Sequence, residues 1–395
     1  MHASRFRTRL GAALACGLLA ALPVNSTGTA SPAQAQPVDQ AVTAKLVTRA
    51  TQIPKLAAAG EADTRVQLIK TQGRWAFGTA VLVAPKIEDY FPYGWLFLAK
   101  RDGTGWQVAF DGEPGFAELS RGAPVISERE RRLFASHGGD AVTPQANGDY
   151  RTGMRLPFAL GQTWNLRGGP HAWDAGSGPW SSLDLNGGDE AVRAARGGTA
   201  YTMCKGWLRV IHDRGYATDY YHLWSNINVN GAGVGEGAFL GYTGTDITCG
   251  GAASGRHVHF ALRQNSAYVG VAYHIIGKWV PQNGSAQYGG SALHGSRRVG
   301  VGGGLYNYGP LGFTQGIVDT VDGTSLNKRS GPGTGYPVVG SVGDAATVSI
   351  SCSANGTTHE GRWGATSLWN KLTDGTWVSD AFLYTGTDGT VNGYC

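Results

Sequence analysis

The chain has 395 residues, and its 33 lysines and arginines against 28 aspartates and glutamates give a formal net charge of +5. This length allows several domains. Part of the positive excess lies at Arg5, Arg7 and Arg9, and downstream the two signs nearly balance, without the basic stripe that nucleic-acid binding needs. We therefore exclude nucleic acid as a partner.

The first 35 residues have the organisation of a secretory signal peptide. The three arginines precede an apolar run over residues 10–24, and Ala33-Gln34-Ala35 forms a small-residue cleavage site. The run is shorter than the roughly 20 apolar residues that span a bilayer. The sequence thus predicts a secreted protein, extracellular or located at the cell wall, with no stable membrane association, and we expect a monomer.

Residues 36–149 are predicted to form a small α+β domain with a linker. Helix patterns occupy residues 41–50 and 126–134, and strand patterns occupy residues 74–83, 95–100 and 105–110. Residues 138–148 are rich in turn-forming residues and predict a flexible linker. The domain is either an accessory domain or a pro-region that is later removed.

Residues 150–310 are rich in glycine and short strand patterns, which predicts an antiparallel β architecture and a mainly β protein. Here His257 and His259 flank a valine in a strand-like run, so both imidazoles lie on one face. Upstream lie His171, in Gly-Gly-Pro-His, and Asp184, in Ser-Ser-Leu-Asp. Two imidazoles and a carboxylate are a ligand set of catalytic zinc sites, which keep a fourth position for water. Surface histidines without a function are the alternative.

A further strand pattern, Tyr-Tyr-His-Leu, contributes His222. Strict alternation predicts that Tyr220 and His222 share one face and that Tyr221 lies on the other. The nearby His212 is predicted to be structural.

Together, the Gly-Gly-Pro-His, Ser-Ser-Leu-Asp, Tyr-Tyr-His-Leu and His-Val-His motifs resemble those of the lysostaphin-type zinc endopeptidases, peptidase family M23. The twelve residues between His171 and Asp184 make the sequence most similar to the beta-lytic, LasA-like branch. The resemblance implies one Zn²⁺ ion bound by His171, Asp184 and His259. It also implies His257 as the general base and His222 as a hydrogen-bond donor to the oxyanion. The implied substrate is a peptidoglycan peptide, cleaved next to glycine.

Two functions from other classes remain alternatives. One is a non-catalytic wall-binding or regulatory protein built on a peptidase fold, which a zinc assay would separate from an enzyme. The other is a zinc N-acetylmuramoyl-L-alanine amidase, which only product analysis would separate from a peptidase.

Four cysteines follow the predicted signal peptide, and an even number in a secreted chain predicts disulfides. Of the three possible connectivities, we predict Cys204–Cys249 and Cys352–Cys395, because each pair then lies within one proposed domain.

Residues 315–395 resemble the bacterial SH3-like β-barrels that are attached to wall enzymes. The similarity lies in Leu326-Asn-Lys-Arg-Ser-Gly-Pro-Gly-Thr-Gly-Tyr and in Gly375-Thr-Trp-Val-Ser-Asp. It implies a cell-wall-binding domain, with a merely stabilising appendage as the alternative. Trp363, Trp369 and Trp377 belong either to its core or to a binding groove.

A wall-lytic enzyme endangers the cell that makes it, so residues 36–149 are predicted to keep a secreted zymogen inactive until cleavage near residues 140–150. We hypothesise that His137 or Asp140 covers the metal in that form. A solvated linker histidine is the alternative.

Overall fold

The computed structural model describes residues 36–395 except residues 55–56, 58–62, 89, 104, 138–147, 174–175 and 177. The predicted signal peptide, most of the predicted linker and Asp140 therefore lie outside the described residues, as does the side chain of His137. Among the residues described, no helix is long and apolar enough to cross a membrane.

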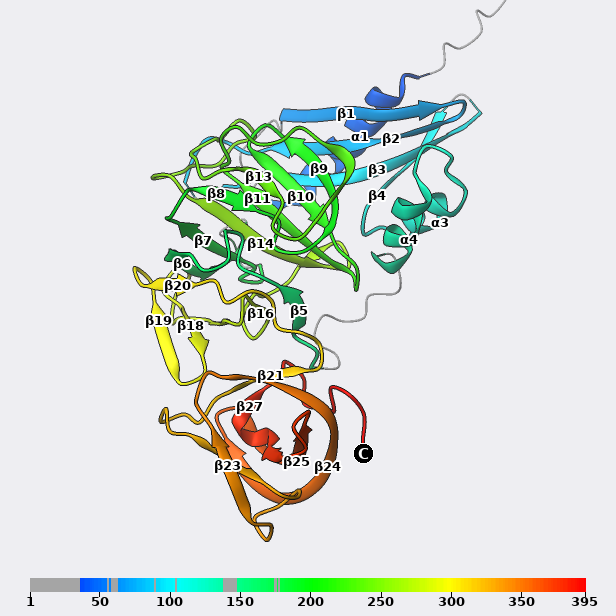
Figure 1. The fold of residues 1–395 in the computed structure, drawn as a ribbon. Helices are drawn as coiled ribbons and strands as arrows, with labels where there is room; N and C mark the ends of the chain where they lie inside the picture. Colours follow the sequence, from blue (N-terminus) through cyan, green and yellow to red (C-terminus); the bar gives the residue numbers. More distant parts are fainter. Residues whose placement is uncertain are drawn as a thin grey trace, which may run out of the picture. The chain divides into compact units, whose positions relative to one another are not determined.

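Residues 36–137, here called the N-terminal region, combine a four-stranded antiparallel sheet with helices (Figure 1). The strands follow one another in chain order: β1 (Asp63–Gln72), β2 (Trp75–Val83), β3 (Tyr93–Asp102) and β4 (Gly105–Phe110). The helices described are α1 (Val38–Thr51), α3 (Pro114–Gly122) and α4 (Glu128–His137). The predicted helices and strands are confirmed, whereas β1 was missed because its burial pattern is mostly exposed and its apolar residues are few.

Both faces of this sheet are covered, which explains the almost continuous burial of β2 and β3. On one face, Val42 and Leu46 of α1 pack against Phe97 and Phe110. The other face shares a second core with helices α3 and α4 and with strands of the following region.

Residues 148–310, here called the central region, are built around a nine-stranded sheet in the order β12-β9-β10-β11-β14-β7-β6-β20, with β15 paired to β14 (Figure 1). The strand bounds are β6 (Thr163–His171), β7 (Ser182–Asn186), β9 (Gly198–Cys204), β10 (Trp207–Ile211), β11 (Tyr216–Tyr221), β12 (Asn230–Val234), β14 (Val258–Gln264), β15 (Ala267–Tyr268) and β20 (Gly304–Tyr306). Its named pairings are antiparallel, and the predicted mainly β architecture is confirmed.

The two faces of β14 meet different cores, as period-two alternation requires. Val258 and Phe260 lie in the principal core of the central region. Ala261 lies in the core shared with the N-terminal region, on the face that also carries His259.

The prediction for Tyr220 and His222 is wrong. Tyr220 lies in the principal core and Tyr221 in the shared core. His222 stacks on Tyr221, with ring centroids 4.3 Å apart, so it lies on the side of Tyr221 and not of Tyr220. The physical reason is that β11 ends at Tyr221, and His222 takes a left-handed backbone conformation (φ 68°) that breaks the alternation.

Short sheets complete the central region. They are β5 (Arg151–Met154) with β16 (Ile275–Ile276), β8 (Ala191–Arg193) with β13 (Phe239–Tyr242), and β17 (Val280–Gln282), β18 (Ser291–His294) and β19 (Arg297–Gly300).

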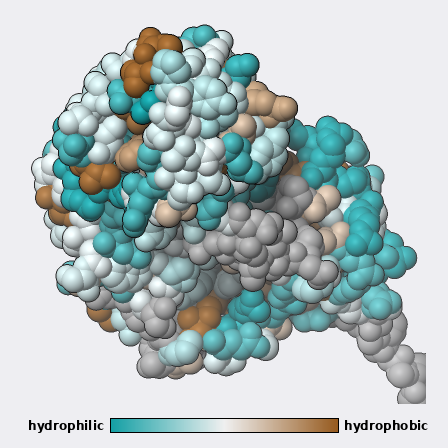
Figure 2. All heavy atoms as spheres, turned by 90° about the horizontal axis from the view of Figure 1, so that it is seen from below, coloured by the Kyte–Doolittle hydropathy of each residue, from teal (hydrophilic) through white to brown (hydrophobic). Residues whose placement is uncertain are grey.

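The C-terminal region, residues 315–395, is a seven-stranded sheet in the order β23-β22-β26-β25-β24-β21-β27. Its elements are β21 (Gln315–Val318), β22 (Leu326–Arg329), β23 (Val338–Val342), β24 (Thr347–Gly361), β25 (Gly364–Leu372), β26 (Trp377–Ser379), the 3₁₀ turn η1 (Asp380–Phe382) and β27 (Leu383–Tyr384). Trp369 and Trp377 are buried, while Trp363 is half-buried and packs on Tyr384. Figure 2 shows a surface that is mostly hydrophilic, with only scattered apolar areas.

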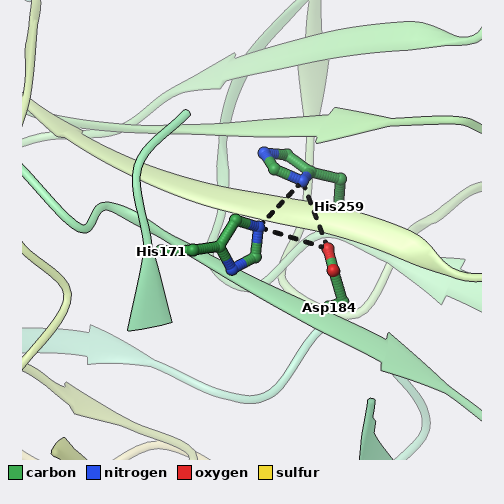
Figure 3. Close-up of side chains that lie close together, drawn as sticks. All are labelled: His171, Asp184 and His259. Atoms are coloured by element: carbon green, nitrogen blue, oxygen red, sulfur yellow. Dashed lines mark hydrogen bonds and ion pairs between the residues drawn. The ribbon is translucent and has the colours of Figure 1, made fainter. Parts of the chain in front are cut away.

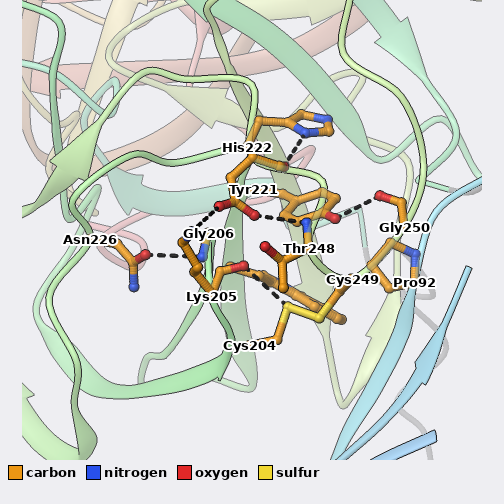
Figure 4. Close-up of a disulfide and its surroundings, with 12 residues drawn as sticks. Pro92, Cys204, Lys205, Gly206, Tyr221, His222, Asn226, Thr248, Cys249 and Gly250 are labelled. Atoms are coloured by element: carbon orange, nitrogen blue, oxygen red, sulfur yellow. Dashed lines mark hydrogen bonds and ion pairs between the residues drawn. A yellow bond between two sulfur atoms is a disulfide. The ribbon is translucent and has the colours of Figure 1, made fainter. Parts of the chain in front are cut away.

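Both predicted disulfides are present, Cys204–Cys249 and Cys352–Cys395. The first joins the end of β9 to a loop that runs toward the histidines of the central sheet (Figure 4). Tyr221 fixes the same loop, because its hydroxyl donates a hydrogen bond of 2.7 Å to the Gly250 carbonyl.

Candidate metal centre and active site

Three side chains from three neighbouring strands converge in the central sheet (Figure 3). His171 is the last residue of β6, Asp184 lies in β7 and His259 lies in β14. The Asp184 Oδ1 atom is 3.6 Å from His171 Nε2 and 3.2 Å from His259 Nδ1, and the two ring nitrogens are 3.3 Å apart. The structure thus brings together all three predicted metal ligands.

The local sequence explains this convergence. Asp184 is the direct cross-strand partner of His259. Register shifts around Gly168 interrupt β6 and turn His171 toward the same point. A Cβ atom at Gly168 would lie 2.8 Å from Asp184 Oδ2, so this glycine of the Gly-Gly-Pro-His motif leaves room for the carboxylate.

The donor set fits a divalent ion such as zinc. Asp184 Oδ1 is buried without a hydrogen-bond partner, although a buried carboxylate oxygen normally has one. The other ring nitrogen of His171 contacts the Gly169 carbonyl at 2.8 Å. Because a carbonyl only accepts, that nitrogen carries the proton, and Nε2 offers its lone pair to a metal.

The electrostatics support the same protonation state. Burial by itself would raise the pKa of Asp184, but the neighbouring His171 and His257 hold it below its ordinary value. Burial lowers the pKa of His259 to about 4, against the opposing effect of Asp184. At neutral pH the group therefore consists of an ionised carboxylate and a neutral His259 imidazole, as metal binding requires.

His257 and His222 lie beside this group, with ring centroids 4.8 Å apart. His257 Nε2 is 3.6 Å from Asp184 Oδ1. Their Nδ1 atoms contact the carbonyls of Gly255, at 2.7 Å, and Asp246, at 3.0 Å. Because a carbonyl only accepts, each Nδ1 donates in these contacts, and Nε2 is the nitrogen left for the site. Burial, reinforced by the two other histidines, lowers the pKa of His222 and keeps it neutral.

Asp184 and His259, together with His222 and His257, line a cleft of about 530 Å³, while His171 is fully buried behind it. Its lining is Glu88, Phe91, Arg167, Asp184, His222, Ala252, Ala253, Ser254, His257, His259 and Tyr288.

Sequence reasoning missed two aromatic residues of the cleft. Tyr288 stacks on the His171 ring at 4.0 Å. Phe91, from the N-terminal region, stacks on the His259 ring at 4.7 Å. Tyr288 lies in a glycine- and serine-rich stretch, where an isolated tyrosine was a weak signal. Nothing in the sequence around Phe91 points to the site, because the contact depends on tertiary packing.

His212 is structural, as predicted. It is buried and contacts Thr218 Oγ1 at 2.9 Å and the Gly197 carbonyl at 3.0 Å.

No protein-family model matches the chain. The beta-lytic metalloendopeptidase of Lysobacter enzymogenes is 30% identical over 139 residues, which are 32% of this chain and 75% of that protein. Protease LasA of Pseudomonas aeruginosa is 32% identical over 147 residues, 34% of this chain and only 35% of LasA. Among solved structures, the M23 metalloprotease pseudoalterin is 32% identical, with a TM-score of 0.37, over 39% of this chain and 97% of that structure.

The match to the Lysobacter enzyme covers three quarters of that protein. On this ground the chain belongs to the beta-lytic, LasA-like branch of the M23 metallopeptidases.

Proposed function

We propose that the protein is a secreted zinc metalloendopeptidase that hydrolyses peptide bonds of bacterial peptidoglycan, next to glycine. The observation that carries this proposal is the convergence of His171, Asp184 and His259 at the floor of a cleft that two further histidines border. Secretion is supported by the two disulfides, which form in oxidising compartments.

His171, Asp184 and His259 would hold the zinc ion. When bound there, zinc polarises the scissile carbonyl and lowers the pKa of a water ligand toward 7. His257 would act as general base toward the attacking water, because its Nε2 lies near Asp184 and its Nδ1 is occupied by the Gly255 carbonyl. His222 lies beside His257 and lines the same cleft, so we propose it as the residue that stabilises the developing oxyanion.

The test is digestion of purified peptidoglycan, followed by mass spectrometry of the soluble fragments. We expect new amino and carboxyl ends within peptides, with glycine at the cleaved bond, and we expect a chelator to abolish cleavage and zinc to restore it. Fragments released only between sugar and peptide would instead establish an amidase. A zinc-loaded protein that releases no fragments would establish a binding protein.

We further propose that the C-terminal region binds the wall. It carries a cavity of about 310 Å³ whose lining combines Trp369, His359 and Arg329 with hydroxyl and carboxylate side chains. An aromatic ring beside polar groups suits a peptide ligand, and a domain that only stabilised the protein would not need such a cavity.

A further inference from the structure

We propose that the N-terminal region keeps the enzyme latent by narrowing its substrate cleft with the connection between β2 and β3, in which Phe91 forms part of the cleft wall and covers one face of His259. The proposal rests on the peptidase function proposed above. The connection, residues 84–92, is described except for residue 89.

Phe91 lies against the metal-ligand group. Its ring is stacked 4.7 Å from that of His259 and lies 6.1 Å from that of His222 and 6.0 Å from Trp173. It is only 7% exposed. Because the ring packs on His259 and lines the cleft, it takes up space beside the metal ligands that a bound peptide would otherwise use.

The connection is fixed at both of its ends by hydrogen bonds to the central region. At one end, Ala84 N donates to the Cys249 carbonyl and Gly251 N donates to the Pro85 carbonyl, both at 3.0 Å. At the other end, the Trp173 indole donates to the Pro92 carbonyl at 2.8 Å. The disulfide at Cys249 holds the loop that receives the first end. A Cβ atom at Gly250 would collide with the carbonyl of Ala84, so the loop is shaped for this contact.

Charged and polar contacts clamp the rest of the N-terminal region to the sheet. Asp111 lies 3.8 Å from Arg209 and 3.5 Å from Arg263, both deeply buried in the central region. Tyr201 donates a 2.7 Å hydrogen bond to Glu130. Together with the shared hydrophobic core, these contacts hold the connection against the cleft.

The block differs from the hypothesis that a histidine or aspartate covers the metal. Among the described residues, the ligand group contains only His171, Asp184 and His259, and the carboxylate of Glu88 is not part of it. Phe91 offers no ligand atom. A chain made latent in this way still binds zinc, and only the binding of substrate is blocked.

The experiment compares the uncut chain starting at residue 36 with the same chain cut at an introduced protease site within residues 138–147 and separated from its N-terminal fragment. We expect both forms to bind one zinc, and the uncut form to hydrolyse a soluble glycine-containing peptide at least 100-fold more slowly. Zinc removal by dipicolinate should be at least tenfold slower in the uncut form, because Phe91 packs on the ligand His259 and narrows the approach to the metal.

Phe91→Ala in the uncut chain should raise peptide hydrolysis and the rate of zinc removal at least tenfold. Phe110→Ala is the matched control, because it removes an equally buried ring from the opposite core. Should the alanine variant fail to fold, Asp111→Asn tests the same block, since it removes only the charge facing Arg209 and Arg263 and should speed zinc removal at least threefold.

Equal rates of zinc removal in cut and uncut chains, or in wild type and Phe91→Ala, would overturn the block. If zinc removal behaves as expected but the cut chain hydrolyses no peptide, the block stands and the proposed function fails.

Discussion

At the residue scale, the site depends on backbone carbonyls that fix each imidazole. His171, His257 and His222 each direct one nitrogen at a carbonyl and keep the other for the cleft. Position alone therefore separates the metal ligands from the other histidines. The nitrogens that converge with the Asp184 carboxylate belong to His171 and His259.

Ligand and catalytic variants should separate in a metal assay. Asp184→Ala and His259→Ala are expected to lose zinc and activity together, because two remaining ligands hold the ion poorly. His257→Ala should retain zinc and lose about 10²–10⁴-fold in kcat, the usual contribution of a general base. Zinc content by mass spectrometry and peptide hydrolysis check both, and full activity in either ligand variant would refute the site.

The left-handed backbone at His222 (φ 68°) predicts a difference between two substitutions. Both His222→Asn and His222→Ala remove the imidazole and should impair turnover. Alanine disfavours this conformation by roughly 1–2 kcal/mol, whereas asparagine tolerates it, and its amide can still donate to the Asp246 carbonyl. We expect the alanine variant to unfold in less urea than the asparagine variant, and equal midpoints would contradict the backbone argument.

The buried carboxyl group of Asp380 leads us to expect that the stability of the fold decreases as the pH rises through 6. Burial raises its pKa to about 6, from about 3.9 in an unfolded chain. The folded state then holds the proton more tightly, so this stabilisation is present below about pH 4 and is lost as the pH rises through 6. At about 1.4 kcal/mol per pKa unit the loss is about 3 kcal/mol. Asp380→Asn should raise the melting temperature at pH 7.5 and leave it unchanged at pH 4, and a uniform shift would exclude titration as the cause.

At the scale of elements, the sequence predicted what depends on periodicity. The alternation along β14 and the residue just before it placed His259 and His257 correctly, and the strands β2, β3 and β4 follow their apolar runs. The prediction for His222 was wrong, because the end of β11 is set by a single left-handed residue and leaves no periodic signal.

The C-terminal region supplies an element-scale prediction. Removing residues 315–395 should weaken sedimentation with purified peptidoglycan while sparing cleavage of a small soluble peptide. The deletion also exposes Ile275 and Leu293, which share a core with Tyr384. Arg329→Ala therefore serves as the cleaner variant, with an expected tenfold weaker affinity, about 1.4 kcal/mol.

The control for Arg329→Ala is Lys371→Ala, which removes a cation from the same sheet but does not line the cavity. Unchanged sedimentation of both variants and of the deletion would favour the appendage role.

At the scale of the whole molecule, the contact between the N-terminal and central regions could not be predicted from the sequence. The apolar residues Phe77, Leu98 and Trp207 each fit a strand of their own region, and only the tertiary structure shows that they form one core. The contact of Arg209 with Asp111 is equally non-local, since Asp111 lies in the N-terminal region, whereas Asp219 faces Arg209 across the β10–β11 pair. Charge balance and periodicity carry no information about such pairings.

The shared core has a consequence for how activity begins. A cut in the segment 138–147 breaks one connection but leaves the interface of the N-terminal region intact. The two fragments then form an ordinary bimolecular complex and lose the roughly millimolar effective concentration that a short tether provides. Under the proposed block, dissociation would follow mass action, so a nicked enzyme would stay inactive where it is concentrated and would become active on dilution.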